Sequence, residues 1–352
     1  MSNIYVPNKT KSFYILPILM VNKLIFIISF LATLFIMDLF IYFSETQSLS
    51  TRNFIENDIQ KRRPNVKLTI FNEGFFWGST NNDGFTGDKL NSKLNKNIIL
   101  IGDSYVEGFQ LFQRHHFMTH LKKSIKYMLG TDYSVINRGM GEQNLSDSYI
   151  SLHNSLLDSS TFIIFINPDQ LHMKSYVTLK KPFVYIENEH LKVDTRYKSE
   201  RTYRIYEKIN SVFSYSTIFQ SIKLMINKIV LGQHIEILFG KLNTLIHVES
   251  NNNVIQEDNK KNISEVNKRI LLDLSSQKDI FLVLMKNITK SQKNWLDQNN
   301  IKTISLEIPL SELKNSGLNP YYWNVTKMEG HWNHRAHKEI GKYIANKIAK
   351  RI

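Results

Sequence analysis

A serine that could act as a nucleophile lies directly after a short apolar run in the first third of the chain. Residues 98–101 are apolar and mostly β-branched, and Gly102, Asp103 and Ser104 end that run. This pattern predicts a buried parallel strand with the serine in a turn at its carboxyl end. Ligands bind at this edge of an open α/β sheet, and a helix beginning there would direct N–H groups toward a developing oxyanion. An ordinary turn, in which Asp103 or Ser104 caps the next helix, is the alternative.

The surroundings of Ser104 resemble the first sequence block of the SGNH (GDSL-type) hydrolase family. That block is Gly-Asp-Ser with a glycine four residues after the serine, and Gly102, Asp103, Ser104 and Gly108 match it. The lipase-type elbow does not fit, because the glycines are not spaced as Gly-x-Ser-x-Gly. The resemblance implies ester chemistry in which Ser104 attacks an acyl carbonyl while its own N–H holds the oxyanion.

Two later turns resemble the family blocks that supply the other oxyanion donors. Residues 137–144 resemble the second block, in which a glycine donates its backbone N–H, and Gly141 is favoured over Gly139 for this role. A tight strand-to-helix turn is the alternative there. Asn167 follows a third apolar run, where the third block has an asparagine whose amide is a donor. Because Pro168 separates it from the next aspartate, Asn167 could instead only cap the strand.

The stretch 329–337 resembles the fifth family block as it occurs in membrane-bound relatives. The resemblance implies that His331 is the general base for Ser104 and that a carboxylate two residues earlier orients the imidazole. In this chain that carboxylate is Glu329 in place of the usual aspartate, and Ala336 replaces a glycine. The sequence therefore predicts Ser104, His331 and Glu329 as the catalytic residues.

A metal site is an alternative interpretation of the same stretch. His331, His334 and His337 are spaced at three-residue intervals, and such histidines share one face of a helix. The three positions straddle a predicted loop-to-helix boundary, and no acidic residue follows at ligand spacing. We therefore expect no metal and no cofactor, while a structural capping role for His331 stays open.

The order of these blocks along the chain implies an α/β fold, a three-layer α/β/α sandwich with a mostly parallel, flavodoxin-like sheet. Apolar runs at 280–285 and 301–308 predict two further strands, and helix-spaced apolar residues predict a helix over 115–129. Alternating residues over 183–194 predict a hairpin. That hairpin would open a mainly helical insertion at about 171–275.

The N-terminal part of the chain predicts one membrane-spanning helix. Residues 24–43 have Asp38 as their only ionisable side chain, and twenty helical residues extend about 30 Å, the thickness of the hydrocarbon layer. Three lysines precede the run and Glu45 is the first charge after it, so residues 1–23 should be cytoplasmic. A cleaved signal peptide would have a shorter apolar region and a small-residue cleavage pattern. A buried soluble helix is the other alternative.

The remainder of the chain is then expected outside the cytoplasm of a bacterial cell, in the periplasm or at the cell surface. Residues 44–90 are polar and rich in turn-forming types, which predicts a stalk and lead-in to a hydrolase-like domain over 91–352. An Asn-x-x-Gly-Phe-x-Gly sequence that begins at Asn81 is similar to the lead-in of membrane-anchored relatives.

Composition restricts the possible partners. The 352 residues carry a formal charge of +14, but the lysines and arginines are scattered and are not gathered with aromatic residues on one element, so we expect no nucleic-acid partner. The absence of cysteine excludes disulfides and thiolate-bound metals, and a hydrophobic share of 42% is enough for a sizeable core.

The expected function is a membrane-anchored serine esterase that removes O-acyl groups, acetyl above all, from a cell-surface or secreted polysaccharide or a small ester. An O-acyltransferase acting on such a glycan is one alternative, and with a single span it would need a multi-span partner that supplies the acyl donor. A non-catalytic glycan-binding or scaffold protein is the other, because the third and fifth blocks are altered.

Overall fold

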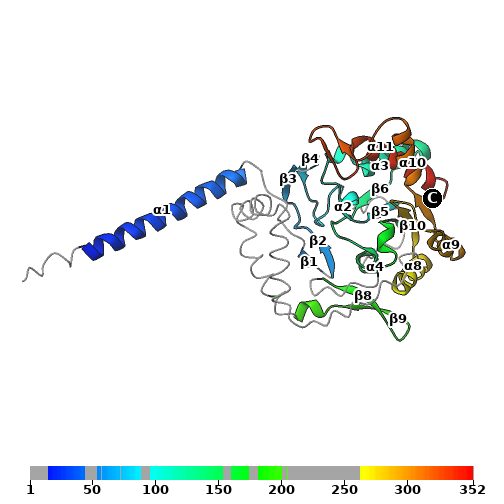
Figure 1. Ribbon diagram of the computed structural model, residues 1–352, viewed down its shortest axis with the longest axis horizontal. Helices are drawn as coiled ribbons and strands as arrows, with labels where there is room; N and C mark the ends of the chain where they lie inside the picture. Colours follow the sequence, from blue (N-terminus) through cyan, green and yellow to red (C-terminus); the bar gives the residue numbers. More distant parts are fainter. Residues whose placement is uncertain are drawn as a thin grey trace, which may run out of the picture.

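A five-stranded parallel sheet forms the centre of the protein (Figure 1). Its spatial order is β11-β10-β7-β5-β6, and every neighbouring pair is parallel. Counted along the chain within the sheet, this is the flavodoxin-like order 2-1-3-4-5, in which ligands bind at the switch point between the first and third strands. Here that point lies between β5 and β7. The strands are β5 (Asn97–Ile101), β6 (Ser134–Asn137), β7 (Ser160–Ile166), β10 (Asp279–Leu284) and β11 (Thr303–Ser305).

The computed structural model describes residues 15–43, 54–56, 58–71, 73–88, 96–153, 160–173, 181–199, 204 and 262–351. Within these ranges the longer helices of the domain are α3 (Phe117–Leu129), α4 (Leu145–His153), α8 (Glu265–Gln277), α9 (Lys290–Gln298), α10 (Glu307–Asn315) and α11 (His334–Ile348). The short helical turns are α2 (Ser104–Glu107), η1 (Gln113–His115), η2 (Pro168–Gln170) and η3 (Arg196–Ser199).

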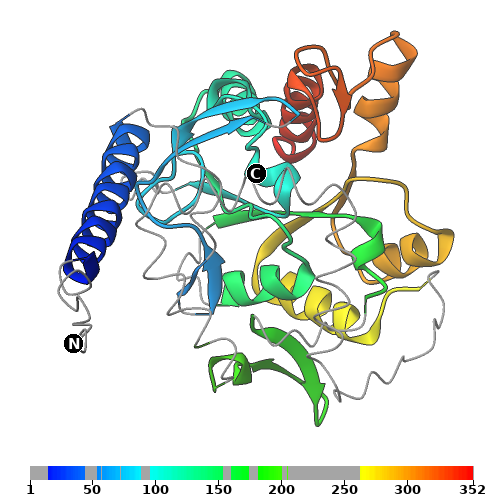
Figure 2. The same ribbon diagram turned by 60° about the vertical axis from the view of Figure 1, so that its left-hand side comes forward.

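Helices cover both faces of the sheet, because the side chains of each strand alternate between two apolar cores. In β5, Ile98 and Leu100 belong to the core shared with α3, α10 and α11. Ile99 and Ile101 belong to the core shared with α4, α8 and α9. Figures 1 and 2 show α3 and α11 side by side over the first face, and α4 and α8 over the second. The predicted three-layer α/β/α arrangement is thus present in the described residues.

The described residues of 54–88 are folded against this sandwich, in the part of the chain where the sequence predicted a stalk and lead-in over 44–90. They contain two antiparallel hairpins, β1 (Phe54–Glu56) with β2 (Ile59–Lys61) and β3 (Lys67–Phe71) with β4 (Phe75–Ser79). The second hairpin has a small core of its own, in which Leu68, Ile70 and Phe76 pack against Phe109. Since Phe109 directly follows the nucleophile segment, the hairpin lies beside it.

The N-terminal helix α1 (Ile15–Phe43) includes the whole predicted span (Figure 1). Its described apolar side chains are exposed apart from Leu34, which is half-buried. Among the described residues, however, no helix has the length and apolarity needed to cross a membrane.

The structure bears differently on the predicted hairpin, the predicted insertion and the last predicted strand. The predicted hairpin is present as β8 (Phe183–Glu187) and β9 (His190–Asp194), whereas most of the predicted helical insertion lies outside the described residues. The predicted strand 301–308 is too long, because β11 ends at Ser305 and its hydroxyl accepts the N–H of Glu307, the first residue of α10. A short hairpin, β12 (Tyr322–Trp323) with β13 (Met328–Glu329), precedes α11.

Candidate active site

Ser104 is the first residue of α2, directly beyond the carboxyl end of β5. The carboxylate of Asp103 caps this turn by accepting the N–H of Tyr105 at 3.0 Å, and Gly108 ends it in the left-handed region, at a φ of 74° that favours glycine. The turn thereby fixes the serine at the sheet edge where the sequence predicted it.

His331 lies against Ser104, as the sequence predicted. The distance between Ser104 Oγ and His331 Nε2 is 2.7 Å, a hydrogen bond across 227 positions of sequence. The ring of Tyr105 packs on the imidazole with 4.4 Å between the ring centres, and it also contacts the buried ring of Trp332. These contacts restrict the imidazole to the position from which it can accept the serine proton.

The carboxylate at the other side of the imidazole belongs to Glu73, not to Glu329. His331 Nδ1 lies 2.8 Å from Glu73 Oε2 and 3.0 Å from Oε1, and the backbone N–H of His331 also donates to Oε2 at 2.6 Å. Glu329 instead accepts a hydrogen bond from the Asn319 side chain at 2.7 Å, on the exposed strand β13. The prediction for Glu329 is therefore wrong in its geometry, because the alternation along β13 directs that carboxylate toward Asn319.

The turn between β3 and β4 delivers Glu73 into this position. Thr326 donates its hydroxyl to the carbonyl of Glu73, so the segment after β12 also holds the turn. A side chain on Gly330 would meet the Glu73 carboxyl group at 2.1 Å, and one on Gly74 would meet the carbonyl of Gln110 at 2.0 Å. Both glycines allow the two loops to approach closely enough for the contact between the carboxylate and the imidazole.

Burial raises the pKa of Asp103, the residue directly before the nucleophile, while its hydrogen bond from Tyr105 and the nearby His331 lower it. Burial likewise raises the pKa of Tyr105 to about 12, so its hydroxyl stays protonated throughout the neutral range. The side chains next to Ser104 thus stand in a desolvated environment, where electrostatic interactions are stronger than in water.

The loop after β6 does not offer the donor that the sequence favoured. The N–H of Gly141 donates to the carboxylate of Glu107 at 3.1 Å, and that of Gly139 donates to Asn137 Oδ1 at 2.8 Å. Met140 and Gln143 likewise have backbone acceptors. Within the described residues, the N–H of Glu142 is the one in this loop without an acceptor. Glu142 also has a φ of 67°, the left-handed region in which glycine is favoured.

Asn167 is placed at the right level of the sheet. Ile101 of β5 pairs with Ile164 of β7, and Ser104 and Asn167 each come three residues after their member of this pair. Both residues therefore lie at the same edge of the sheet, at the switch point. The Asn167 side-chain oxygen accepts the N–H of Asp169 at 3.4 Å and caps η2. No hydrogen bond engages its amide N–H groups in the described part of the chain, so they are free to bind a ligand.

The two histidines of α11, His334 and His337, contact neighbouring parts of the fold. His337 Nδ1 accepts the N–H of Phe117 at 3.1 Å, and burial keeps its pKa well below the ordinary value. His334 contacts His115 in an edge-to-face arrangement, with 5.1 Å between the ring centres. Across the described residues, no group of three or more His, Cys, Asp or Glu side chains is arranged to hold a metal ion.

No protein-family model and no curated protein matches the chain. Among solved structures, it is similar to a lipase/acylhydrolase from Enterococcus faecalis, at 13% identity and a TM-score of 0.38 over 73% of this chain and 96% of that one. A member of the lipolytic protein G-D-S-L family from Veillonella parvula matches at 13% identity and 0.34, over 73% and 100%. An acetyl xylan esterase from Geobacillus stearothermophilus matches at 11% and 0.34, over 72% and 94%.

Two groups at the site had no signal in the sequence. Glu73 is 258 residues away from the histidine that it contacts, in an Asn-Glu-Gly turn without any local spacing rule. Glu107 belongs to the matched first block, yet its side chain is buried and bonded to the loop after β6, a contact that only the folded chain reveals.

Proposed function

We propose that this protein is a serine hydrolase of ester bonds with SGNH-type chemistry. The hydrogen-bonded series Ser104, His331 and Glu73 carries the proposal, because nucleophile, base and orienting carboxylate stand in the order that such catalysis requires. The series lies at the switch point of an open parallel sheet, the place where ligands bind in such folds.

In the proposed reaction, His331 Nε2 takes the hydroxyl proton while Ser104 Oγ attacks the acyl carbonyl. Glu73 accepts the Nδ1–H, which fixes the tautomer and stabilises the imidazolium that forms. The proton then passes to the leaving alkoxide, and an acyl-enzyme remains on Ser104. Water, deprotonated by His331, then attacks this ester, and His331 returns the proton to Ser104 Oγ as the carboxylic acid is released.

The oxyanion is held in this proposal by the N–H of Ser104 and the side-chain amide of Asn167. The Ser104 N–H is the first of α2 and has no acceptor within the described residues, so it is free to donate. The Gly141 N–H is not assigned to this role, since Glu107 already accepts it.

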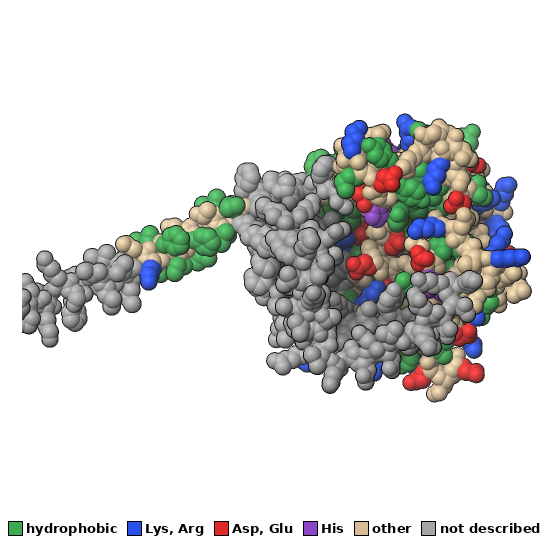
Figure 3. All heavy atoms as spheres, viewed as in Figure 1, with side chains coloured by type: hydrophobic (Ala, Val, Ile, Leu, Met, Phe, Trp, Pro, Cys, Tyr) green, Lys and Arg blue, Asp and Glu red, His purple; other side chains and the backbone are tan. Residues whose placement is uncertain are grey.

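We place the substrate among O-acetylated polysaccharides or small acetyl esters outside the cytoplasm. The apolar run 24–43 would anchor the chain in the bacterial cytoplasmic membrane with its N-terminus inside. On the described part of the face drawn in Figure 3, basic and acidic side chains are interspersed. No nucleic-acid partner, metal or cofactor enters the proposal.

The first prediction tests the nucleophile and the base. With a chromogenic acetyl ester, Ser104→Ala and His331→Ala in the full chain should fall close to background, because removing either member of such a unit abolishes most of the acceleration. Asn167→Ala should lose about 10²–10³-fold in kcat and stay measurable. A fluorophosphonate probe should label Ser104 in the wild type.

Products distinguish the esterase from its alternatives. Incubation with an acetyl ester and an oligosaccharide acceptor should release free acetate, whereas acetylated sugar as the main product would indicate an acyltransferase. A wild-type chain that binds polysaccharide but resists the fluorophosphonate would contradict the enzyme and indicate a binding module.

A further inference from the structure

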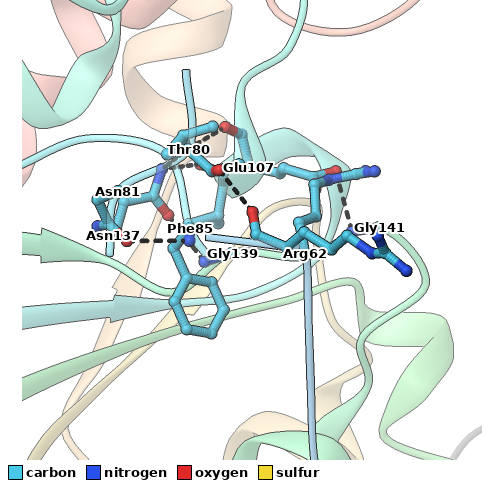
Figure 4. Close-up of polar contacts among 11 residues, drawn as sticks. Arg62, Thr80, Asn81, Phe85, Glu107, Asn137, Gly139 and Gly141 are labelled. Carbon is cyan, nitrogen blue, oxygen red and sulfur yellow. Dashed lines mark hydrogen bonds and ion pairs between the residues drawn. The ribbon is translucent and has the colours of Figure 1, made fainter. Parts of the chain in front are cut away.

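A buried carboxylate lies at the other end of the turn that carries the nucleophile. Glu107 is the last residue of α2, three positions after Ser104, and its side chain is only 6% exposed. One oxygen accepts Arg62 Nε at 2.7 Å, and the other accepts the N–H of Gly141 at 3.1 Å (Figure 4). A buried carboxylate needs partners that compensate its charge, and here Arg62 and the Gly141 N–H provide them. Glu107 therefore joins three segments that are distant in sequence: α2, the strand end at Arg62 and the loop after β6.

A second set of contacts joins α2 to Thr86 and to Asn137 at the end of β6. The backbone carbonyl of Glu107 accepts the Thr86 hydroxyl at 2.7 Å, and that hydroxyl accepts the Asn137 amide at 2.9 Å. The Asn137 amide also donates to the carbonyl of Val106, while its oxygen accepts the N–H of Gly139 (Figure 4). The loop after β6 is thus bonded to α2 directly at Gly141 and, through the side chain of Asn137, at Gly139.

Arg62 is held independently of the carboxylate. Its backbone N–H donates to the carbonyl of Gly84 at 3.1 Å, and its guanidinium lies 4.6 Å from the centre of the Phe109 ring. Arg62 therefore presents a fixed cation to Glu107 Oε1, which leaves Oε2 to accept the N–H of Gly141.

We propose that Glu107 is a positioning residue for the ester chemistry, an inference that rests on the proposed function. By accepting the Gly141 N–H, its carboxylate sets the distance between α2, which carries Ser104, and the loop after β6. Glu142, the next residue, then keeps its N–H, for which the described residues offer no acceptor, at a fixed place beside the nucleophile turn. Small misplacements of groups around a reacting centre reduce turnover strongly, and about 10²-fold is typical.

Two double variants separate this role from simple stability. Arg62→Met with Glu107→Leu replaces the buried ion pair by apolar side chains, an exchange that is often neutral or stabilising. Arg62→Met with Glu107→Gln also removes both charges but retains an oxygen that can accept the Gly141 N–H. We expect the Leu variant to lose about 10²-fold in kcat with KM changed by less than about twofold. The Gln variant should remain within about fivefold of the wild type, although its unpaired amide makes it the less stable of the two.

Asp194→Asn is the matched control. Asp194 is also a buried carboxylate that accepts a backbone N–H and a guanidinium, both from Arg196, but it lies in the β8–β9 hairpin away from the site. This variant should lower the Tm and leave kcat unchanged.

The outcomes distinguish this inference from the proposed function. Equal kcat values for the Leu and Gln double variants, in a chain whose wild type hydrolyses esters, would overturn the role of Glu107 alone. A wild type without turnover and without fluorophosphonate labelling would overturn the proposed function, and the role of Glu107 with it.

Discussion

The side of His331 that faces away from Ser104 determines which carboxylate can assist it. Nδ1 lies against Glu73, and the same carboxylate also accepts the His331 backbone N–H, so both ring and main chain are held by one group. Glu329 is exposed and contacts Asn319. We therefore expect a glutamine substitution to lower kcat strongly at Glu73 and to leave it nearly unchanged at Glu329.

Glu73→Gln should reduce kcat by about 10³–10⁴-fold, because an amide can favour the wrong imidazole tautomer and does not stabilise the imidazolium. Glu329→Gln is the matched control, and its kcat should stay within about twofold of the wild type. Steady-state kinetics on an acetyl ester, with the Tm of each variant, measures both. A large loss in Glu329→Gln together with an active Glu73→Gln would restore the assignment made from the sequence.

Ser104 and His331 were predictable, and Glu73 was not, for a physical reason. The serine and the histidine each lie in a short stretch whose residue types are set by local needs, a strand-ending turn in one case and a helix start in the other. Asn333, for example, caps α11 by accepting the N–H groups of Arg335 and Ala336. Glu73 depends on where a distant hairpin packs, and no local pattern encodes that. Gly141 was predicted from the resemblance to the second family block, but its N–H donates to the Glu107 carboxylate.

At the scale of elements, two helices meet through a buried histidine. His337 on α11 accepts the N–H of Phe117, the first residue of α3, and this bond requires a neutral imidazole. Burial keeps the pKa of His337 well below 6.5 and lowers that of the neighbouring His116 to about 3. The packing of α3 on α11 is therefore coupled to pH.

Both histidines bind a proton more readily in the unfolded chain than in the folded one. Their contribution to stability is thus present above about pH 6.5 and is lost progressively as the pH falls below that value. The free energy of unfolding should decline between pH 6.5 and 4 by about 1 kcal/mol or more beyond the decline of His337→Gln, whose side chain accepts the same N–H without titrating. Urea unfolding at several pH values measures this difference, and parallel curves for the two proteins would contradict it.

The strands and their ends were the elements best predicted from the sequence. The runs 98–101 in β5 and 162–166 in β7 are apolar at every position because helices cover both faces of the sheet, and this pattern is visible without a structure. The hairpins over 54–79 were missed, since β3 and β4 are short and one face of β4 is exposed. From sequence alone, this polar and turn-rich stretch is typical of a linker, although it contains Arg62 and Glu73.

At the scale of the whole molecule, the chain divides into an apolar N-terminal segment and a sandwich whose last helix ends at the surface. Arg351, just beyond α11, is exposed, so a C-terminal fusion leaves the site and the sheet undisturbed. In the proposed topology the sandwich lies outside the cytoplasm, because Lys9, Lys11 and Lys23 precede the run 24–43 and retain the N-terminus inside.

A C-terminal alkaline phosphatase fusion expressed in bacteria should therefore be active, whereas a green fluorescent protein fusion exported in the same way should be dark. Deleting residues 24–43 from both fusions is the matched control and should reverse both signals, because the apolar run is the segment assigned to membrane insertion. Replacing the three preceding lysines by glutamate should weaken the orientation without shortening the helix. Bright fluorescence and an inactive phosphatase from the unaltered chain would place the Ser104 site in the cytoplasm, and acetylated glycans of the cell surface would then be out of its reach.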